Sequence, residues 1–432
     1  MTFGARAPGA AAICAVFALI FFSSNERCAA AVQRTQLPNG SNVIVRRDLA
    51  VPVVAVELWF RTPSVGFRAP VVGLSRYAAT AIAASAPRGG ISLSDLVKSL
   101  GGRFVISAYA DAISVAASVP AGSERRVLRA LSAAYFTPLL SASAMRSALR
   151  DVAIAGAQQQ LDPEANLHDA LFGQLFTSGP AHYPTLPASA AALSRLSLAQ
   201  LREFAQRAFR SSNAIVTAAG HAGDDLTANL IGRADERAME GPVDSLPARA
   251  ATMTTQAYGE DAIGLAWLGP SIRDTRAATA LDFIADYLFR ADTGTVARAT
   301  GRDADESLLS GQFITLHDPG VMLVEIAGKQ LDRLQAQVQE QLDRIKQPLP
   351  RRAFDEARTA FAYHILSDTE TPLAMADNFG WYAVEGDALY APSDDGAKYL
   401  QTLESLDPAF VAQVARQYLG QPTRVHFTAA RK

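Results

Sequence analysis

Hydrophobic and polar positions along this chain follow two periods, that of β-strands and that of α-helices. The turn signal Asn39-Gly40 precedes a β-branched run, and Val51 to Phe60 is predicted as a strand because it is rich in β-branched and aromatic residues. The stretch Gly73 to Ile82 predicts a buried amphipathic helix, since its apolar residues recur at helical spacing. These core positions are Leu74, Tyr77, Ala78, Ala81 and Ile82.

The same alternation of strands and helices continues through the first half of the chain. Strands are predicted over 103–108, 112–119 and 214–219, and helices over 93–100, 123–136, 142–160, 166–176 and 198–209. Ser123 is expected to cap its helix through the side-chain hydroxyl.

This order of elements recurs in the second half at an offset of about two hundred residues. The matching pairs are 54–59 with 263–268, 112–118 with 320–326, and the helix 196–209 with 406–419, each helix followed by a strand. Agreement of three segments at one offset indicates a duplicated domain and not a short repeat. The predicted fold class is therefore α+β, with two tandem halves that each pack helices on a mostly antiparallel sheet.

The chain begins with a segment typical of a secretory signal. Arg6 precedes an apolar run at 11–22, and small residues follow at 29–31. The run is too short to span a bilayer comfortably, so a retained anchor is the alternative to cleavage. Cys14 and Cys28 are the chain's two cysteines and both lie in this leader, so the mature form would have no thiol. The predicted organisation is a signal peptide at 1–31, an N-terminal half at 32–226, a linker at 227–257 and a C-terminal half at 258–432. Secretion, to a bacterial periplasm, is the expected localisation.

Composition agrees with a packed globular protein. Hydrophobic residues make up 49% and charged residues 19% of the 432, and the net charge is −2. Charges of both signs are interspersed, so the sequence gives no reason to expect nucleic acid or an anionic membrane surface as a partner. Beyond the leader, no stable membrane insertion is expected.

In the order and spacing of its segments the chain resembles the pitrilysin/insulinase-type zinc peptidases. The likeness is greatest to their smaller branch, which includes the mitochondrial processing peptidase and the core proteins of the respiratory cytochrome bc complex. It covers nearly the whole mature chain and implies two α/β-roll halves. The residues that carry it are Leu37-Pro38-Asn39-Gly40, Pro52 to Val56, Gly73-Leu74, Leu100 to Phe104 with Asp111 beyond, and the closing helix and strand.

The resemblance also locates a metal site, and the residues found there cannot form one. Active members carry His-x-x-Glu-His on the Gly73 helix, where two His bind zinc and the Glu is the general base, and a later Glu completes the shell. These positions fall on Arg76, Ala79, Thr80 and Gly156. Arginine repels a dication, alanine cannot accept a proton, and threonine and glycine offer neither imidazole nor carboxylate. We therefore expect no zinc, no other cofactor and no catalytic residue.

Other features of the family are altered as well. The substrate-lining strand that usually carries Asn-Ala here has Val105-Ile106, and the Arg and Tyr pair of the second half has no clear counterpart near 298–309. Arg76 has two interpretations: it pairs with a nearby carboxylate, or it contributes to binding a peptide or partner.

The remaining polar residues do not point to a replacement site. None of the six histidines lies two to four residues from another, so no local metal pair exists. His168-Asp169 and His317-Asp318 are interpreted as surface or capping residues, and His364 with Asp368 as a helix-surface pair. The run from Arg351 to Arg358 is expected to form a solvated helix face, and the stripe Leu331, Leu334, Val338, Leu342, Ile345 to pack in the core.

Three functions follow in order. The first is a non-catalytic homologue that pairs with an HxxEH-bearing subunit, the two lining a chamber in which an extended peptide adds to a sheet edge. The second is a stand-alone module that binds peptides or proteins. The third is a peptidase with a relocated site, for which the sequence offers no supporting motif.

Overall fold

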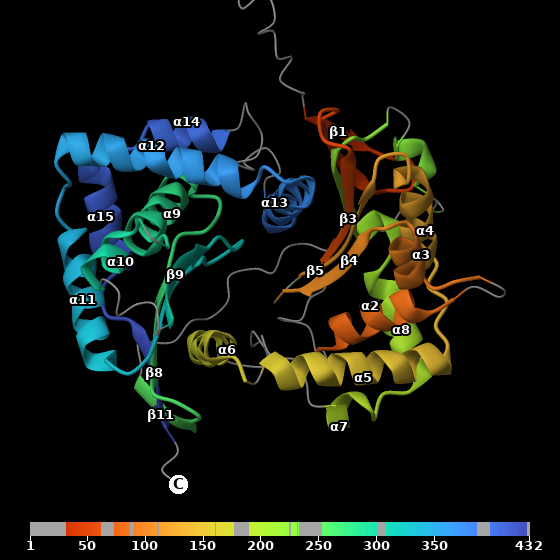
Figure 1. Cartoon of the computed structure of the whole chain (residues 1–432), viewed down its shortest axis with the longest axis horizontal. Helices are drawn as coiled ribbons and strands as arrows, with labels where there is room; N and C mark the ends of the chain where they lie inside the picture. The colour runs from red at the N-terminus through yellow and green to blue at the C-terminus, as the bar shows by residue number, and fades with distance from the viewer. Residues whose placement is uncertain are drawn as a thin grey trace, which may run out of the picture.

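A computed structural model of the chain describes residues 32–61, 73–86, 90–109, 112–159, 161–176, 190–223, 226–230, 232, 253–291, 293–300, 308–386 and 398–429. The predicted signal peptide lies outside these residues. Two sheets, one from each half of the chain, stand face to face with helices outside and between them (Figure 1). The predicted α+β class with two halves is confirmed.

The N-terminal sheet has the order β1-β2-β6-β3-β5-β4 and is antiparallel except where β2 pairs with β6. The turn at Asn39-Gly40 joins β1 to β2, with Gly40 at a positive φ of 88° that favours glycine. Its strands are β1 (Gln33–Gln36), β2 (Asn42–Arg47), β3 (Val53–Arg61), β4 (Arg103–Ala108), β5 (Ala112–Pro120) and β6 (Ala214–Gly220).

The C-terminal sheet repeats this topology. Its order β7-β11-β8-β10-β9 corresponds strand by strand to β2-β6-β3-β5-β4, and the parallel pair β7–β11 corresponds to β2–β6. The matched segments of the sequence are thus equivalent strands of two copies, which confirms the duplication. The strands are β7 (Met253–Tyr258), β8 (Ala262–Leu268), β9 (Leu308–Ile314), β10 (Val321–Ala327) and β11 (Thr423–Ala429).

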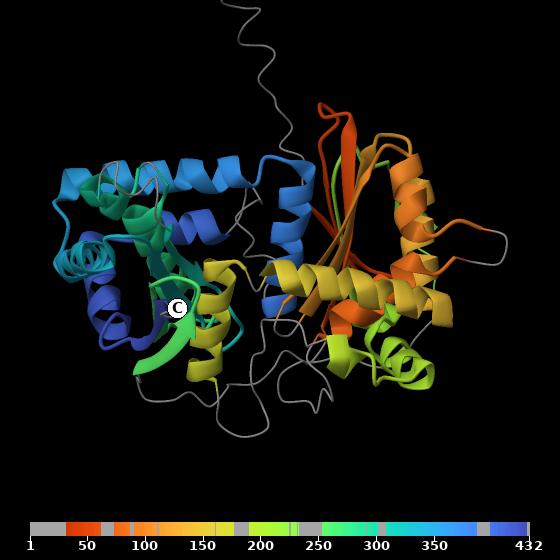
Figure 2. The same ribbon diagram turned by 60° about the horizontal axis from the view of Figure 1, so that its bottom comes forward.

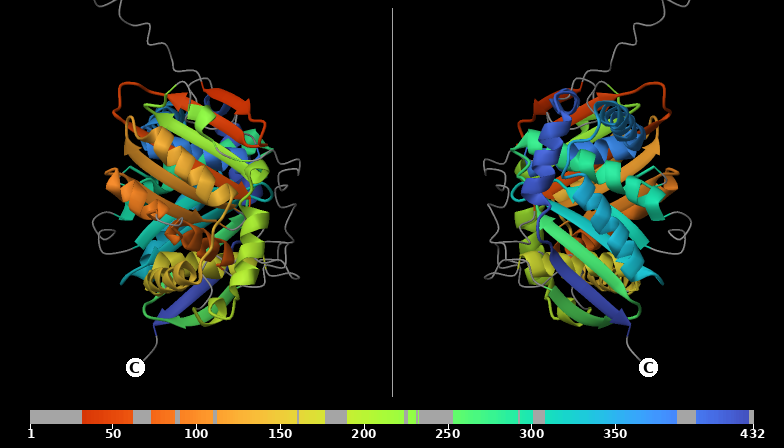
Figure 3. Two further views of the ribbon diagram at one scale, coloured as in Figure 1. Left: turned by 90° about the vertical axis from the view of Figure 1, so that its right-hand side faces the viewer. Right: turned by 90° about the vertical axis from the view of Figure 1, so that its left-hand side faces the viewer.

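Helices cover the outer face of each sheet, and each side view looks onto one of these outer layers (Figure 3). Alternation along β3 sends Val54, Val56, Leu58 and Phe60 into the outer core of the N-terminal half. The covering helices are α2 (Leu74–Ala84), α3 (Leu93–Ser99), α4 (Glu124–Phe136) and α8 (Leu198–Ala208), with α5 (Ala142–Gln159) and α7 (Ala190–Leu193) outside α2 and the short helices η1 (Ser211–Asn213) and η2 (Leu226–Asn229) before and after β6. The C-terminal half has α9 (Thr275–Phe289), α10 (Thr295–Thr300), α11 (Leu331–Arg344), α12 (Arg351–Asp368), α14 (Lys398–Glu404) and α15 (Pro408–Tyr418).

The inner face of each sheet is covered by a helix from the other half. Helix α6 (Pro163–Leu175) belongs to the first half and packs on β8, β10 and β11, whereas α13 (Pro372–Glu385) belongs to the second half and packs on β3, β5 and β6 (Figure 2). Leu167, Leu171 and Leu175 of α6 are buried against the C-terminal sheet. The predicted halves are therefore interlocked by an exchange of helices, because each sheet would otherwise expose its inner apolar face.

Several details differ from the sequence-based expectation. The predicted linker 227–257 contains β7 from Met253 onward, because parallel pairing with β11 overrides a composition of small and polar residues. Ser123 stands at the N-cap of α4, but its side chain makes no capping bond. Among the described residues, none of the helices is both long enough and apolar enough to cross a lipid bilayer.

Candidate functional site

The helix that would carry the metal ligands is formed as the sequence predicts. Gly73 is the N-cap residue of α2 at a φ of 79°, a conformation that glycine adopts without strain. Leu74, Tyr77, Ala78, Ala81 and Ile82 are all buried, as the apolar spacing requires. The tyrosine hydroxyl donates to the carbonyl oxygen of Met145 on α5 at 3.2 Å, so α2 is fixed against the helix that carries Gly156.

The α5 surface that meets α2 is small and apolar. Ala148 and Val152 belong to the same buried cluster as Ala78 and Ala79, and Gly156 follows one turn later on that face. The two helices therefore lie together as the resemblance requires. That Arg76, Ala79, Thr80 and Gly156 meet at one point stays a prediction.

Each substituted position on α2 is accommodated by the scaffold without a metal. Ala79 is 0% exposed, and its carbonyl oxygen accepts a hydrogen bond from the hydroxyl of Tyr135 at 3.0 Å. The Thr80 hydroxyl donates to the carbonyl oxygen of Arg76 at 2.8 Å, so its hydrogen is used within the helix. These side chains are consistent with helix packing and do not fit a zinc shell.

Arg76 is the unusual residue of this group. Its side chain is half-buried, and burial lowers the pKa of the guanidinium, although an arginine remains a cation in proteins. Within the described ranges no carboxylate forms an ion pair or hydrogen bond with it, unlike the ion-paired arginines of α9, α11 and α12. The interpretation that Arg76 pairs with a nearby carboxylate is therefore wrong for this part of the chain. A partly desolvated cation without a counter-charge is left at the former metal position.

Histidine and carboxylate side chains gather elsewhere, but not as a metal site. In the part of the chain that the structure describes, no three His, Cys, Asp or Glu side chains lie close enough to hold an ion. His168 packs on Phe172 with ring centroids 4.6 Å apart, and burial lowers the pKa of the His168 imidazole to about 4. It is a core residue rather than the surface residue that its sequence neighbourhood suggested.

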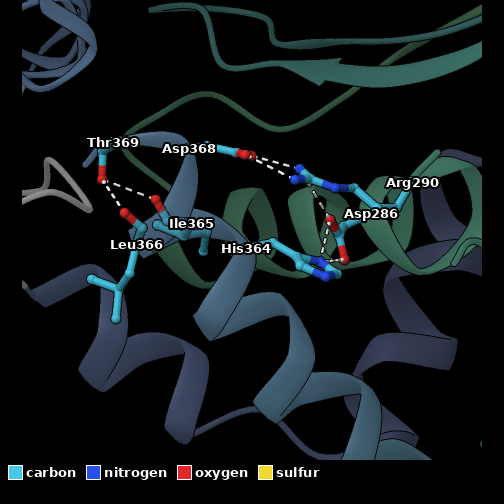
Figure 4. A network of polar contacts seen from close by, with 7 residues as sticks. All are labelled: Asp286, Arg290, His364, Ile365, Leu366, Asp368 and Thr369. Carbon is cyan, nitrogen blue, oxygen red and sulfur yellow. Dashed lines mark hydrogen bonds and ion pairs between the residues drawn. The ribbon is translucent and has the colours of Figure 1, made fainter. Parts of the chain in front are cut away.

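His364 bonds to a different partner from the one predicted (Figure 4). Its Nδ1 lies 3.0 Å from both carboxylate oxygens of Asp286 on α9, whereas Asp368 accepts from Arg290. The expected pair within α12 is wrong, because packing of α12 on α9 brings a closer carboxylate to the ring. No hydroxyl or thiol of the described residues is hydrogen-bonded to His364, so the His–Asp pair has no nucleophile to activate.

The joint between the halves holds polar groups that sequence reasoning missed. Glu57 is 1% exposed on the inner face of β3, with Asp377 of α13 and Ser114 of β5 within hydrogen-bonding reach. Burial raises the pKa of Glu57 to about 8, and the negative charge of Asp377 adds to the shift. Asp377 is also within reach of the Tyr109 hydroxyl, and burial raises its pKa as well.

Glu325 is placed in a similar way on the other sheet. It is 1% exposed on β10 under α6, accepts a hydrogen bond from Ser310 at 3.0 Å, and burial raises the pKa of Glu325 to about 8. A single acidic residue inside an apolar strand is the only signal in the sequence for either site. At neutral pH these groups are neutral acids inside an interface, not general bases open to a substrate.

Direct contacts fix α13 on the N-terminal sheet. Arg61 donates from Nε and Nη2 to the carbonyl oxygen of Val384 at 2.9 and 2.7 Å, which satisfies an end of the helix that favours positive charge. Gly380 lies on the indole of Trp59, so close that a Cβ there would meet Nε1 at 1.9 Å. Tyr109 stacks on Trp59 with centroids 5.2 Å apart, and Trp381 meets both rings edge-on.

Comparison with known proteins agrees with the fold. The sequence matches no protein-family profile. It also matches none of the curated proteins. A protease from Helicobacter pylori superposes with a TM-score of 0.80 at 16% identity, over 93% of this chain and 100% of that one. An inactive domain of a peptidase M16 from Pseudomonas fluorescens gives 0.76 at 15% identity, over 93% and 99%. A chain of complex III2 from Candida albicans gives 0.72 at 13% identity, over 92% and 95%. The resemblance read from the sequence is confirmed in the fold, and this chain has the two-half architecture of the M16, or pitrilysin-type, peptidases.

Proposed function

We propose that this protein is a secreted, periplasmic and non-catalytic subunit that lines a peptide-binding chamber together with an HxxEH-bearing homologue. The observation that carries the proposal is the composition of α2, where Arg76, Ala79 and Thr80 stand in place of the ligands and the base. The helix is intact and packed on α5. Loss of chemistry with retention of the scaffold favours a structural or binding role over degradation of the fold.

The fold of related structures supports the same proposal. The Pseudomonas fluorescens chain is itself described as an inactive domain, and the Candida albicans chain occurs within a multi-subunit complex. Pseudo-enzymes of this architecture therefore have precedents both for an empty centre and for assembly.

Strand β4 supports the peptide-binding part of the proposal. It is the last strand of its sheet and pairs with β5 alone among the described strands. Its outer backbone N–H and C=O groups can therefore pair with an added extended segment. Val105 and Ile106 are half-buried there, so an added strand would meet an apolar side of β4.

The test uses the mature protein purified from its native envelope. We expect substoichiometric zinc by elemental analysis, no cleavage of extended peptides by the isolated chain, and co-purification with a homologue that carries HxxEH. Peptide cleavage by that homologue should increase when this chain is added. One equivalent of zinc, or cleavage by the isolated chain, contradicts the proposal; a monomer that binds peptide alone favours the stand-alone module.

A gain-of-function variant tests the assignment of the positions. We expect zinc to bind in one equivalent after four simultaneous substitutions, because His and carboxylate ligands would return to adjacent helices. The matched control keeps glycine at 156 and should bind zinc more weakly, since one ligand is missing. Failure of both proteins to bind zinc while remaining folded would show that α2 and α5 do not form the former centre. The substitutions are Arg76→His, Ala79→Glu, Thr80→His and Gly156→Glu.

A further inference from the structure

A cavity of about 400 Å³ opens in the outer layer of the C-terminal half, where α9, α10 and α11 lie together (Figure 1). It is on the opposite side of the C-terminal sheet from α6 and is not part of the α2–α5 region. Leu288 and Ile345 contribute an apolar floor, each 1% exposed. Polar side chains from all three helices complete the lining.

The charge of this lining is positive. Arg298 of α10 and Arg344 of α11 both line the cavity. Arg344 pairs with Glu340 at 2.5 Å, but within the described ranges no carboxylate bonds to Arg298. The charge of Arg298 acts on the phenol of Tyr287, another lining residue, in opposition to the burial that raises the pKa of that group. One guanidinium is therefore available to an anion.

The lining also contains hydrogen-bonding capacity that the described residues leave unused. The Thr295 hydroxyl is buried and has no partner among them. Gln341 is 8% exposed and lines the same cavity. A buried hydroxyl without a partner destabilises the fold, so such a group marks a position where a ligand oxygen would be favoured.

We propose that this cavity binds an organic phosphate whose apolar portion rests on Leu288 and Ile345 and whose oxygens accept from Arg298, Arg344 and Thr295. A guanidinium fork matches phosphate oxygens in geometry and charge, and guanidinium and hydroxyl donors outnumber what a planar carboxylate can use at once. Such a ligand comes either from a soluble phosphate monoester or from the headgroup of an anionic lipid.

Calorimetry with hexyl phosphate, inorganic phosphate and hexanoate tests the class of ligand. Hexyl phosphate should bind at least about tenfold more tightly than inorganic phosphate, because its chain buries apolar surface. It should also bind more tightly than hexanoate, which has one charge and two oxygens. Vesicles of phosphatidylcholine with and without phosphatidic acid identify the source: binding that depends on phosphatidic acid assigns a lipid, and binding of hexyl phosphate alone assigns a soluble ligand.

Three variants test the residues. Arg298→Gln should weaken hexyl phosphate binding about tenfold or more, the usual effect of losing a charge-assisted hydrogen bond. Thr295→Val should weaken it several-fold without lowering the urea midpoint, because the hydroxyl has no partner to lose. Arg352→Gln is the control: it removes the same charge from a side chain that is 92% exposed on α12, and binding should not change. The proposal is overturned if neither probe binds at millimolar concentration, if hexanoate or inorganic phosphate binds as tightly, or if Arg298→Gln and Arg352→Gln behave alike.

Discussion

Stability of the folded chain should decrease as pH rises through the neutral range, and Glu57 is the clearest cause. In the unfolded chain its carboxyl titrates near 4.5, whereas in the fold burial beside Asp377 raises the pKa to about 8. Between these values the folded state holds a proton that the unfolded state has released. The free energy of unfolding therefore falls by about 1.4 kcal/mol per pH unit for this group, and the fall ends above about pH 8.

Glu57→Gln isolates this contribution. The amide has nearly the same shape and is neutral at every pH, so the variant should lose one proton's worth of slope. The difference in unfolding free energy between variant and wild type should grow by up to about 4 kcal/mol between pH 5 and pH 8, which is an upper bound because relaxation of the joint reduces it. Urea unfolding followed by tryptophan fluorescence measures both slopes, with Glu356→Gln on the surface of α12 as the control. Parallel slopes for wild type and Glu57→Gln would refute the reasoning.

Other buried groups add to the pH profile with known signs. Glu325 should contribute like Glu57, because burial raises its pKa to about 8. Asp282 contributes in the same direction up to about pH 7, since burial raises its pKa to about 7 despite a hydrogen bond from Tyr399. His168 acts oppositely: burial lowers its pKa to about 4, so the stability that its neutral form provides is lost as pH falls from 6.5 toward 4. A net fall in stability from about pH 5 to pH 8 remains.

Two further predictions concern the joint between the halves. Gly380→Ala should destabilise the chain by about 1–3 kcal/mol or more, since its Cβ would lie 1.9 Å from the Trp59 indole nitrogen. Gly173→Ala on α6 is the matched control and should be neutral or stabilising by up to about 1 kcal/mol, because no heavy atom lies within 4 Å of that Cβ. Arg61→Gln should lower the urea midpoint and increase amide exchange in the last turn of α13, where the carbonyl of Val384 loses its donors. Unchanged exchange there would show that the helix end does not depend on Arg61.

Local pattern was sufficient for most elements and for the duplication. Apolar spacing placed α2 correctly, and strand alternation placed β4 at its observed bounds. What local pattern could not supply was the identity of tertiary partners. His364 was matched to a carboxylate four residues away, but the shorter contact comes from Asp286, 78 residues distant in sequence. Arg76 was expected to find a carboxylate, and nothing in its own helix could show that none is described nearby.

The exchange of α6 and α13 illustrates the same limit at the scale of domains. Each helix follows its own half in the sequence, and its apolar stripe indicates burial without saying against which sheet. The same holds for Glu57, whose position in an apolar strand gives no sign that Asp377, 320 residues later, lies beside it. Sequence periodicity determines which face of an element is buried, whereas long-range contacts determine what chemistry the buried face acquires.

Stability and chemistry therefore depend on different parts of this molecule. Helix α2 tolerates alanine at position 79 because that side chain is fully enclosed and alanine favours a helix, and threonine at 80 because its hydroxyl bonds within the helix. Neither substitution removes a contact that joins the halves, since those contacts involve α13 with β3 and α6 with β8. A metal centre can be lost from such a scaffold without loosening the enclosure around it. This separation explains how a chain with no zinc ligands on α2 can keep the two-half architecture that a peptide-enclosing partner requires.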